Sequence, residues 1–238
     1  MRIKKKINKN TSYNNKCLGC NVCCRDDNFI PISPVDLYRL TKFTELSGKE
    51  TLETYCSIAI HKRTGLPIAI LKKKVGGQCV FKSGVLCLLG ENKPETCLLH
   101  PLKKIHSELE EPQYMYKNID CEIANRKIDT ISTVERTLQN KEGIDIAELT
   151  YNWGKQLHLL AYEVIGDYKN LQKTLHPSFR DDVQYKLAQT LYDIGRTSNL
   201  SKQMNNNYKK ARKLLHNVRK MSSNNLTNKK TLPIGKWK

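Results

Sequence analysis

The spacing of apolar residues divides the chain into a mixed first part and a helical second part. The first predicted element is a helix over residues 34–43, because apolar residues recur there at helical intervals. Its apolar stripe consists of Val35, Leu37, Leu40 and Phe43. Ser33 is a suitable N-cap, and Pro34 suits the first helical position, where no backbone N–H is needed. A second helix is expected over residues 49–60, and it would contain Cys56.

Short apolar runs separated by glycine predict β-structure in the middle of the chain. Residues 67–71 have the sequence Pro-Ile-Ala-Ile-Leu, and a pair of glycines follows this run. Residues 79–89 resemble two short strands joined by a glycine-containing link, which predicts a hairpin with its turn at residues 82–84. Such a hairpin would bring Cys79 and Cys87 close together at one end of two antiparallel strands.

Proline residues mark the next predicted element, a short helical turn. Pro94 can begin this turn, which would present Cys97, and Pro101 ends it. Residues 106–118 are polar and are expected to form an exposed loop. Cys121 precedes a helix-favouring run, so it is expected at a helix N-terminus, where the helix dipole lowers the pKa of a thiol.

Helical spacing dominates the chain from residue 144 onward. The first stripe consists of Ile146, Leu149, Trp153, Leu157, Leu160, Ala161, Val164, Ile165 and Tyr168. A second helix is expected near residues 180–195, closed by Gly195. Both helices are expected to pack against the first part of the chain. Beyond residue 200 only residues 208–220 suggest a further helix, which is basic and poor in apolar residues.

These elements together predict an α+β fold, in which a cysteine-rich half with a small antiparallel sheet or hairpin precedes a C-terminal helical segment. The expected divisions are a disordered basic arm over residues 1–16, a cysteine-cluster metal-binding domain over residues 17–125, a helical segment packed on it over residues 126–200, and a basic flexible tail over residues 201–238.

The positive charge lies at the two ends of the chain. The formal net charge is +18, but residues 1–16 carry six Lys and Arg without an acid, and residues 201–238 carry eleven without an acid. The chain between them is nearly neutral. Basic ends can bind nucleic-acid phosphates by releasing counterions, or they can simply keep a protein soluble. Solubility is favoured, since Asn and Ser rather than stacking aromatic residues accompany the charges.

Composition also indicates the compartment. No apolar run approaches the roughly 18–20 residues that span a bilayer, and no apolar segment of a secretory signal follows the basic N-terminus. A cytoplasmic, reducing location without membrane association is therefore expected. In such a location cysteine pairs are more often metal ligands than disulfides, and the odd count of nine also fits a disulfide framework poorly.

Eight of the nine cysteines form the candidate chemistry of this chain. Four lie within eight residues, and four follow at wider intervals. The predicted metal ligands are Cys17, Cys20, Cys23, Cys24, Cys79, Cys87, Cys97 and Cys121. Thiolates select zinc, copper(I) or iron–sulfur clusters. The ninth cysteine, Cys56, is isolated and is expected to be structural.

The spacing favours iron over zinc. Three cysteines at two-residue intervals, Cys17, Cys20 and Cys23, resemble the ligand run of bacterial [4Fe–4S] ferredoxins. A remote cysteine would complete that site, while Cys24 would face elsewhere. Structural zinc sites more often use two separate Cys-x2-Cys pairs, so zinc remains the alternative. Eight thiols suffice for two four-thiolate centres. His100, near Cys97, is a further candidate ligand or an ordinary loop histidine.

The order of these residues resembles the YkgJ-type cysteine-cluster family, described as a zinc- or iron-chelating domain. The resemblance covers residues 17–125 and is carried by Cys-x2-Cys-x2-Cys-Cys, by the hairpin cysteines, by Lys93-Pro94-x2-Cys97-x2-His100-Pro101 and by Cys121. Two arginines usual in the family are replaced here, because its Arg-Pro is Lys93-Pro94 and its Cys-Arg is Cys97-Leu98. All eight thiols are retained.

The resemblance also implies two further expectations. The family includes flagellin lysine N-methylases, so it implies a protein lysine methyltransferase that uses S-adenosylmethionine as an alternative to a metal-binding module. No glycine-rich loop of the kind that binds this cofactor in doubly wound folds is present. A protein substrate would be the partner of such an enzyme, and the third alternative is a nucleic-acid-associated protein acting through its basic ends.

Overall fold

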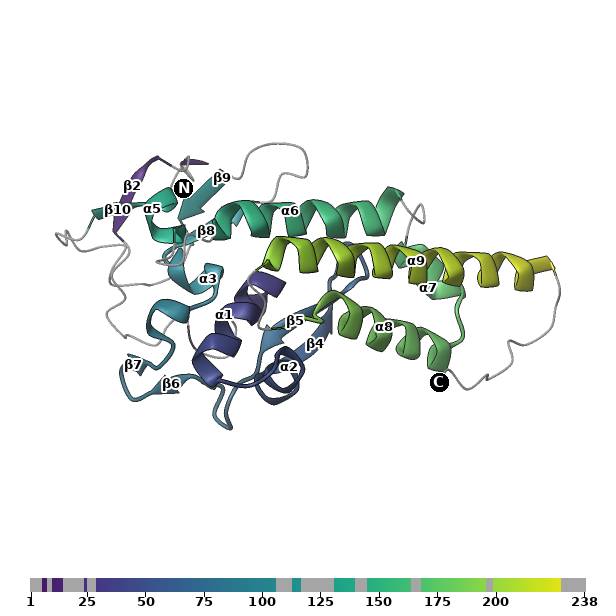
Figure 1. Ribbon diagram of the computed structural model, residues 1–238, viewed down its shortest axis with the longest axis horizontal. Coiled ribbons are helices and arrows are strands. Elements are labelled where there is room, and N and C mark those ends of the chain that lie inside the picture. The colour runs from purple at the N-terminus through teal and green to yellow at the C-terminus, as the bar shows by residue number, and fades with distance from the viewer. Residues whose placement is uncertain are drawn as a thin grey trace.

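The computed structural model contains small antiparallel sheets followed by a group of helices (Figure 1). The residues that the structure describes are 6–7, 10–14, 24, 29–105, 113–116, 131–139, 145–163, 168–195 and 199–227. Apart from one strand at residues 131–133, the strands belong to the first half of the chain, and the long helices belong to the second. The predicted α+β class is therefore confirmed.

Helix α1, Pro34–Thr44, forms where the apolar stripe predicted it. The Ser33 hydroxyl accepts a hydrogen bond from the N–H of Asp36, and the Asp36 carboxylate accepts one from the N–H of Ser33. These reciprocal bonds satisfy two N–H groups at the start of the helix. Leu37 and Leu40 are fully buried. Because α1 contacts a sheet, α2 and two C-terminal helices, it connects the two parts of the fold.

The main sheet has three antiparallel strands in the order β3 (Pro31–Ile32), β5 (Pro67–Leu71) and β4 (Cys56–Ile60). Helix α2, Gly48–Tyr55, directly precedes β4. The helix predicted over residues 49–60 is therefore right in its first part and wrong in its last five residues. Those five residues pair with β5 along their whole length, and the ladder of interstrand bonds ends the helix.

The predicted hairpin exists, but its turn is displaced toward the C-terminus. Strand β6, Lys82–Ser83, pairs with β7, Leu86–Cys87, so the turn lies at Gly84 and Val85 rather than at residues 82–84. Gly84 has a φ of +52°, a left-handed conformation that glycine adopts without strain. The position of the residue with positive φ, rather than the polar pair before it, therefore sets the turn.

A 3₁₀ turn, η2 (Gly90–Asn92), and a one-turn helix, α3 (Glu95–Leu98), follow the hairpin. Pro94 stands at the N-cap of α3, and Pro101 follows a cis peptide bond just after it. The predicted helical turn that carries Cys97 is confirmed.

Two smaller sheets lie where the sequence predicted none. The first has the order β1 (Lys6–Ile7), β9 (Gln113–Tyr116) and β8 (Leu102–Ile105), and the second pairs β2 (Ser12–Asn14) with β10 (Ile131–Thr133). The expectation of a disordered arm over residues 1–16 is wrong at β1 and β2. The expected loop over residues 106–118 is wrong at β9. Tyr13 and Tyr114 are buried, and single aromatic residues of this kind leave no apolar period in the sequence.

Helices form the second half of the chain. They are α5 (Val134–Leu138), α6 (Ile146–His158) with its π-helical extension η3 (Leu159–Glu163), α7 (Tyr168–Thr174), α8 (Pro177–Leu191) and α9 (Leu200–Thr227). Helix α8 begins and ends earlier than the predicted range of 180–195, since Pro177 occupies a first-turn position. No helix in the described ranges combines the length and the apolar character needed to cross a membrane.

The long helix α9 corrects the expectation of a flexible tail from residue 201. Its 28 residues run beside α6 and α8 (Figure 1). The buried residues of α9 are Leu200, Met204, Asn207, Ala211, Leu215 and Val218. These recur every three or four residues, but Lys and Asn surround them, and the average polarity of the segment hid the stripe. The predicted basic helix over residues 208–220 lies within α9.

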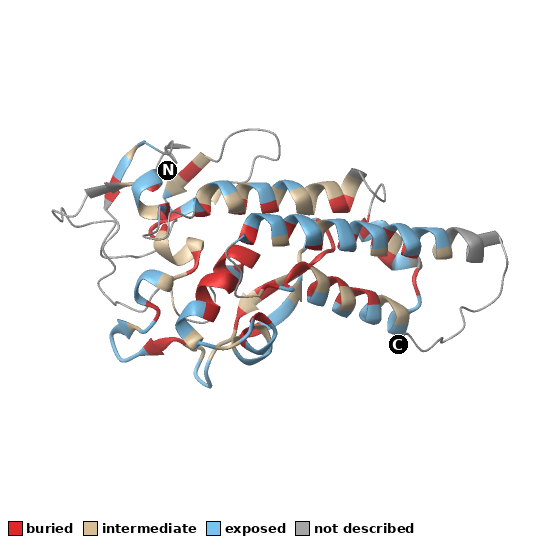
Figure 2. Ribbon diagram, viewed as in Figure 1, coloured by how far each residue is buried: buried red, intermediate tan, exposed pale blue. Residues whose placement is uncertain are grey.

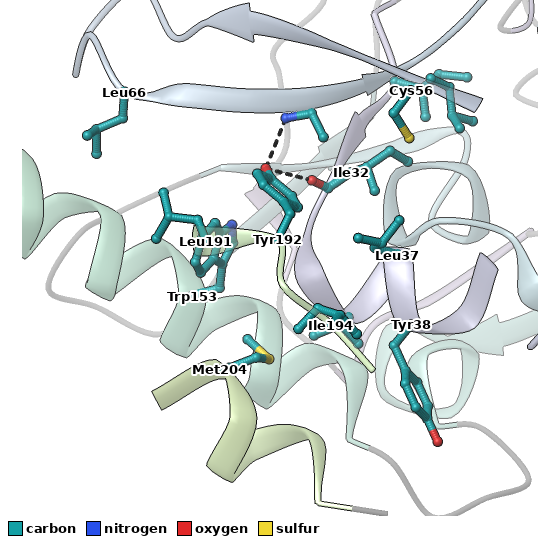
Figure 3. Close-up of a cluster of buried hydrophobic side chains, with 14 of the residues drawn as sticks. Ile32, Leu37, Tyr38, Cys56, Leu66, Trp153, Leu191, Tyr192, Ile194 and Met204 are labelled. Atoms are coloured by element: carbon teal, nitrogen blue, oxygen red, sulfur yellow. Dashed lines mark hydrogen bonds between the residues drawn. The ribbon is translucent and has the colours of Figure 1, made fainter. Parts of the chain in front are cut away.

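The hydrophobic core lies between the main sheet, α1 and the C-terminal helices (Figures 2 and 3). Tyr192, just after α8, points into it and is 2% exposed. Its hydroxyl accepts a hydrogen bond from the N–H of Ala69 on β5 and donates one to the carbonyl of Ile32 on β3, both at 3.0 Å. Ala69 and Ile32 face each other in the sheet. One side chain from the helical half therefore joins two strands of the first half.

Candidate metal centre

Cys79 lies at the base of the hairpin, in a position set by a tight turn. The chain reverses at Gly76 and Gly77, which both have positive φ, so the turn requires residues without a side chain. Cys79 then forms an isolated bridge with Lys73, on the opposite side of this turn. Its side chain is 6% exposed. The turn therefore fixes a buried thiol immediately before strand β6.

Backbone hydrogen bonds bring Cys24 and Cys87 to the same place. The N–H of Cys79 donates to the carbonyl of Cys24 at 2.9 Å, although the two residues are far apart in the sequence. The N–H of Lys82 donates to the carbonyl of Cys79 at 2.9 Å, and Lys82 pairs with Cys87 across the hairpin. Cys24 and Cys87 are both half-buried. The first cysteine run and the hairpin therefore meet at Cys79.

The thiol of Cys79 interacts electrostatically with both neighbours. Burial raises the pKa of Cys79, the backbone N–H of Phe81 opposes this shift, and the nearby thiols of Cys24 and Cys87 raise the pKa further. Lys73 acts in the lowering direction. Thiols that disfavour one another's ionisation become thiolate ligands when a cation replaces their protons.

Cys97 is held by contacts between α3 and α1. The Asp36 carboxylate accepts a hydrogen bond from the N–H of Glu95 at 2.7 Å, while its other oxygen accepts from the N–H and the hydroxyl of Ser33. One buried carboxylate thus caps α1 and also receives the first N–H of α3. Burial raises the pKa of Asp36, and Glu95 raises it further, whereas the bonds from Ser33 and Glu95 lower it.

Arg39 holds the loop that leads to α3. Its guanidinium donates to the carbonyls of Glu91 and Lys93, and the residue is 4% exposed. Buried guanidinium groups need several acceptors because all their N–H groups must be satisfied. Asp36 and Arg39 are three residues apart on α1, so one face of this helix positions the whole approach to Cys97.

A second buried contact holds α3 from the other side. Lys104 on β8 forms a 3.0 Å ion pair with Glu95, in which the two side chains are only 6% and 13% exposed. The same ammonium donates to the hydroxyl of Thr150 on α6 at 3.0 Å. The short helix that carries Cys97 is therefore connected to α1, β8 and α6, and its position does not depend on its own single turn.

These supporting residues were not identified from the sequence. None of the four residues, Asp36, Arg39, Glu95 and Lys104, was predicted to support the cysteine site. A signal was present, because Asp36 and Arg39 interrupt an apolar stripe of the chain. Charged residues inside an apolar stripe usually have buried partners.

The predicted ligands divide into two groups. Cys24, Cys79, Cys87 and Cys97 lie in the described part of the chain, and the structure brings the first three together. The other four, Cys17, Cys20, Cys23 and Cys121, lie outside the described residues. Within the described ranges, no group of three Cys, His, Asp or Glu side chains is arranged to hold a metal ion. The assignment of all eight thiols as ligands stays a prediction.

Cys56 and His100 occupy different surroundings. Cys56 lies in the core near Tyr192 (Figure 3), and burial raises its pKa to about 12. Its structural role was expected from its isolation in the sequence. His100 is 5% exposed and follows α3, where its N–H donates to the carbonyl of Cys97 at 3.4 Å.

The comparisons with known proteins concern the cysteine-bearing half. Residues 16–122 match the family model CxxCxxCC, described as "Putative zinc- or iron-chelating domain". The matched segment includes all eight predicted ligands. No curated protein and no solved structure matches the chain.

Proposed function

We propose that residues 16–122, which match the family model of a zinc- or iron-chelating domain, bind an iron–sulfur cluster through cysteine thiolates. The observation that carries the proposal is the meeting of Cys24, Cys79 and Cys87 at the base of the hairpin. A chelating domain needs sulfurs from remote parts of the chain to converge, and this contact joins the first cysteine run to the second group.

The position of Cys24 separates it from the other three cysteines of the first run. Its carbonyl accepts a hydrogen bond from the N–H of Cys79, and its thiol raises the pKa of the Cys79 thiol, so we group Cys24 with the distal cysteines. The ferredoxin-like triplet Cys17, Cys20 and Cys23 is then left to hold a [4Fe–4S] cluster with a fourth thiolate. Such a cluster supplies one-electron chemistry or, like a structural metal, stabilises the fold.

The surrounding protein has properties suited to such a centre. Asp36 and Arg39 fix the approach to Cys97 from α1, and the Lys104–Glu95 ion pair fixes α3 from β8. Residues that orient metal ligands in this way are as important to affinity as the ligands themselves. Three of these charged partners, Asp36, Arg39 and Lys104, lie on α1 and β8, outside the segments that carry the thiols.

The test is native mass spectrometry of anaerobically purified protein, together with assays of iron, zinc and acid-labile sulfide. We expect iron and sulfide in equal amounts. The variant Cys79→Ser should lose most of the bound metal, whereas the matched control Cys56→Ser should retain it, since Cys56 lies in the core. Zinc without sulfide would contradict the iron–sulfur assignment, and metal retention by Cys79→Ser would contradict the role of this cysteine.

A further inference from the structure

The outward face of α9 is strongly basic. Residues 200–227 contain seven Lys and Arg and no acid. All seven are exposed, while the opposite side of the helix is buried against the core. Figure 2 shows this division along α9, with buried and exposed residues on opposite sides.

Four of these lysines form one straight line. Lys202, Lys209, Lys213 and Lys220 follow one another at intervals of seven, four and seven residues. At about 100° per residue, all four lie within about 30° of the direction opposite the buried stripe. The line extends over about 27 Å, because the helix rises about 1.5 Å per residue. This lysine line therefore points directly away from the protein.

No charge in the described structure neutralises the lysine line. Lys210, on the flank of α9, forms a 3.8 Å ion pair with Asp193. Within the described ranges, no carboxylate lies at ion-pair distance from any of the four lysines of the line. Unpaired charges of one sign in a row produce a strong local potential that attracts a polyanion.

We propose that the lysine line binds the phosphate backbone of a nucleic-acid duplex without selecting its sequence. A strand of duplex DNA carries a phosphate about every 3.4 Å, so a line of about 27 Å can meet several phosphates. Lysine suits this role because it binds phosphate as a flexible point charge. Asn205, Asn206 and Asn217 are exposed beside the line and can donate hydrogen bonds to phosphate oxygens.

Two other polyanions fit this face less well. Single-stranded nucleic acid is usually held by stacking on exposed aromatic residues, and Tyr208 on α9 is half-buried beside the core. An anionic membrane usually receives the apolar side of an amphipathic helix, whereas Met204, Ala211 and Leu215 are already buried in the protein. The duplex backbone requires only the charge that the helix presents.

Point substitutions test the proposal, because deletion of α9 would remove core residues. Fluorescence anisotropy would measure binding of the full chain to short DNA and RNA duplexes of about 24 base pairs. With four phosphate contacts, affinity should fall about 100-fold between 50 and 200 mM NaCl. The variant K202Q/K209Q/K213Q/K220Q should lose this binding, and the pair K209Q/K213Q should show about half the salt dependence.

The matched control is K42Q/K62Q/K169Q/K173Q, which removes the same charge from exposed positions on α1, α7 and the main-sheet hairpin. It should bind like the wild type. Equal losses in both quadruple variants would overturn the proposal, since net charge alone would then explain binding. Stronger binding to phosphatidylserine vesicles than to either duplex, or no duplex binding by the wild type, would also overturn it. Bound metal should be the same in all variants, so this test is independent of the metal proposal.

Discussion

The main sheet and the cysteine-bearing segment are held together in different ways. Strands β4 and β5 are five residues long, and β5 alternates buried and half-buried residues beneath α8. Strands β6 and β7 have only two residues each. Val85, in the turn between them, and Leu86, next to Cys87, are each 68% exposed. Burial of apolar surface thus stabilises the sheet along its whole length, whereas the cysteine segment combines a few buried residues, such as Phe81 and Leu89, with turns and polar contacts from α1.

This difference explains what each region can do. A fully packed region fixes its side chains, and Cys56 there is a small apolar residue rather than a ligand. In the cysteine segment the backbone is fixed at Asp36, Arg39 and the glycine turn, while the thiols of Cys24 and Cys87 stay half-buried and accessible to an ion. A metal centre would add to the stabilisation that these contacts supply.

The largest expected difference between the two regions is in thiol reactivity. With a pKa of about 12, Cys56 should carry roughly 1,000-fold less thiolate than an ordinary cysteine at pH 8, and its alkylation should slow in proportion. Peptide mapping after timed iodoacetamide treatment of metal-depleted, folded protein would measure this. Unfolding in urea should abolish the protection. Alkylation of Cys56 in the folded protein at the rate of Cys87 would contradict the comparison.

The contact between the two halves is tested by Gly48→Ala. A Cβ at position 48, the first residue of α2, would overlap the carbonyl of Ile194, which is backbone and cannot rotate away. We expect a loss of about 3 kcal/mol in the free energy of unfolding, measured with urea. Gly195→Ala is the control, because its Cβ would meet only the side chain of Gln203 at 3.5 Å. Equal stability of the two variants would disprove the close approach.

Two capping boxes test the role of buried polar contacts. Asp36 and Glu50 occupy the same position in α1 and α2, but only Asp36 is buried and bonded to α3. Asp36→Ala should cost about 2 kcal/mol, because the half-buried N–H groups of Ser33 and Glu95 lose their acceptor. Glu50→Ala should cost about 0.5 kcal/mol. Urea unfolding would measure both losses of stability. Similar losses in the two variants would contradict the role of Asp36 in holding α3.

The sequence predicted elements wherever the local pattern was sufficient. Ser33, Pro34 and the stripe of α1 lie next to one another in the chain, so that helix was correct. The strand β4 was assigned to a helix because its structure depends on β5, a partner that local periodicity does not include. The buried stripe of α9 was too sparse to stand out from its basic surroundings. In both cases the structure differs from the prediction because contacts between residues remote in the sequence determine it.

The candidate site divides in the same way. Spacing identified the cysteines, since clustered thiols are conspicuous in any sequence. It could not identify Arg39 or Lys104, whose role depends on α3 lying against α1 and β8. Polar residues that hold ligands in place become recognisable only when the tertiary contacts are known.

The smallest expected effect concerns His61, at the turn between β4 and β5. Burial lowers the pKa of this histidine, and the nearby Arg63 lowers it further. Its Nδ1 lies 2.9 Å from the hydroxyl of Thr64 and accepts from the N–H of the same residue at 3.4 Å, so the neutral ring fits the turn. The folded state therefore resists protonation, and the stability that His61 contributes should be fully present above pH 6.5 and lost as the pH falls through its lower folded-state pKa.

The size of this effect should be below about 1 kcal/mol, because water partly screens the turn. Urea midpoints at pH 7.5 and pH 5.5 would be compared for the wild type and for His61→Asn, which keeps an acceptor but does not titrate. The wild type should lose slightly more stability than the variant on acidification. A larger loss in His61→Asn would contradict the direction of the shift. Because other groups titrate equally in both proteins, the difference isolates one residue at the edge of the packed sheet.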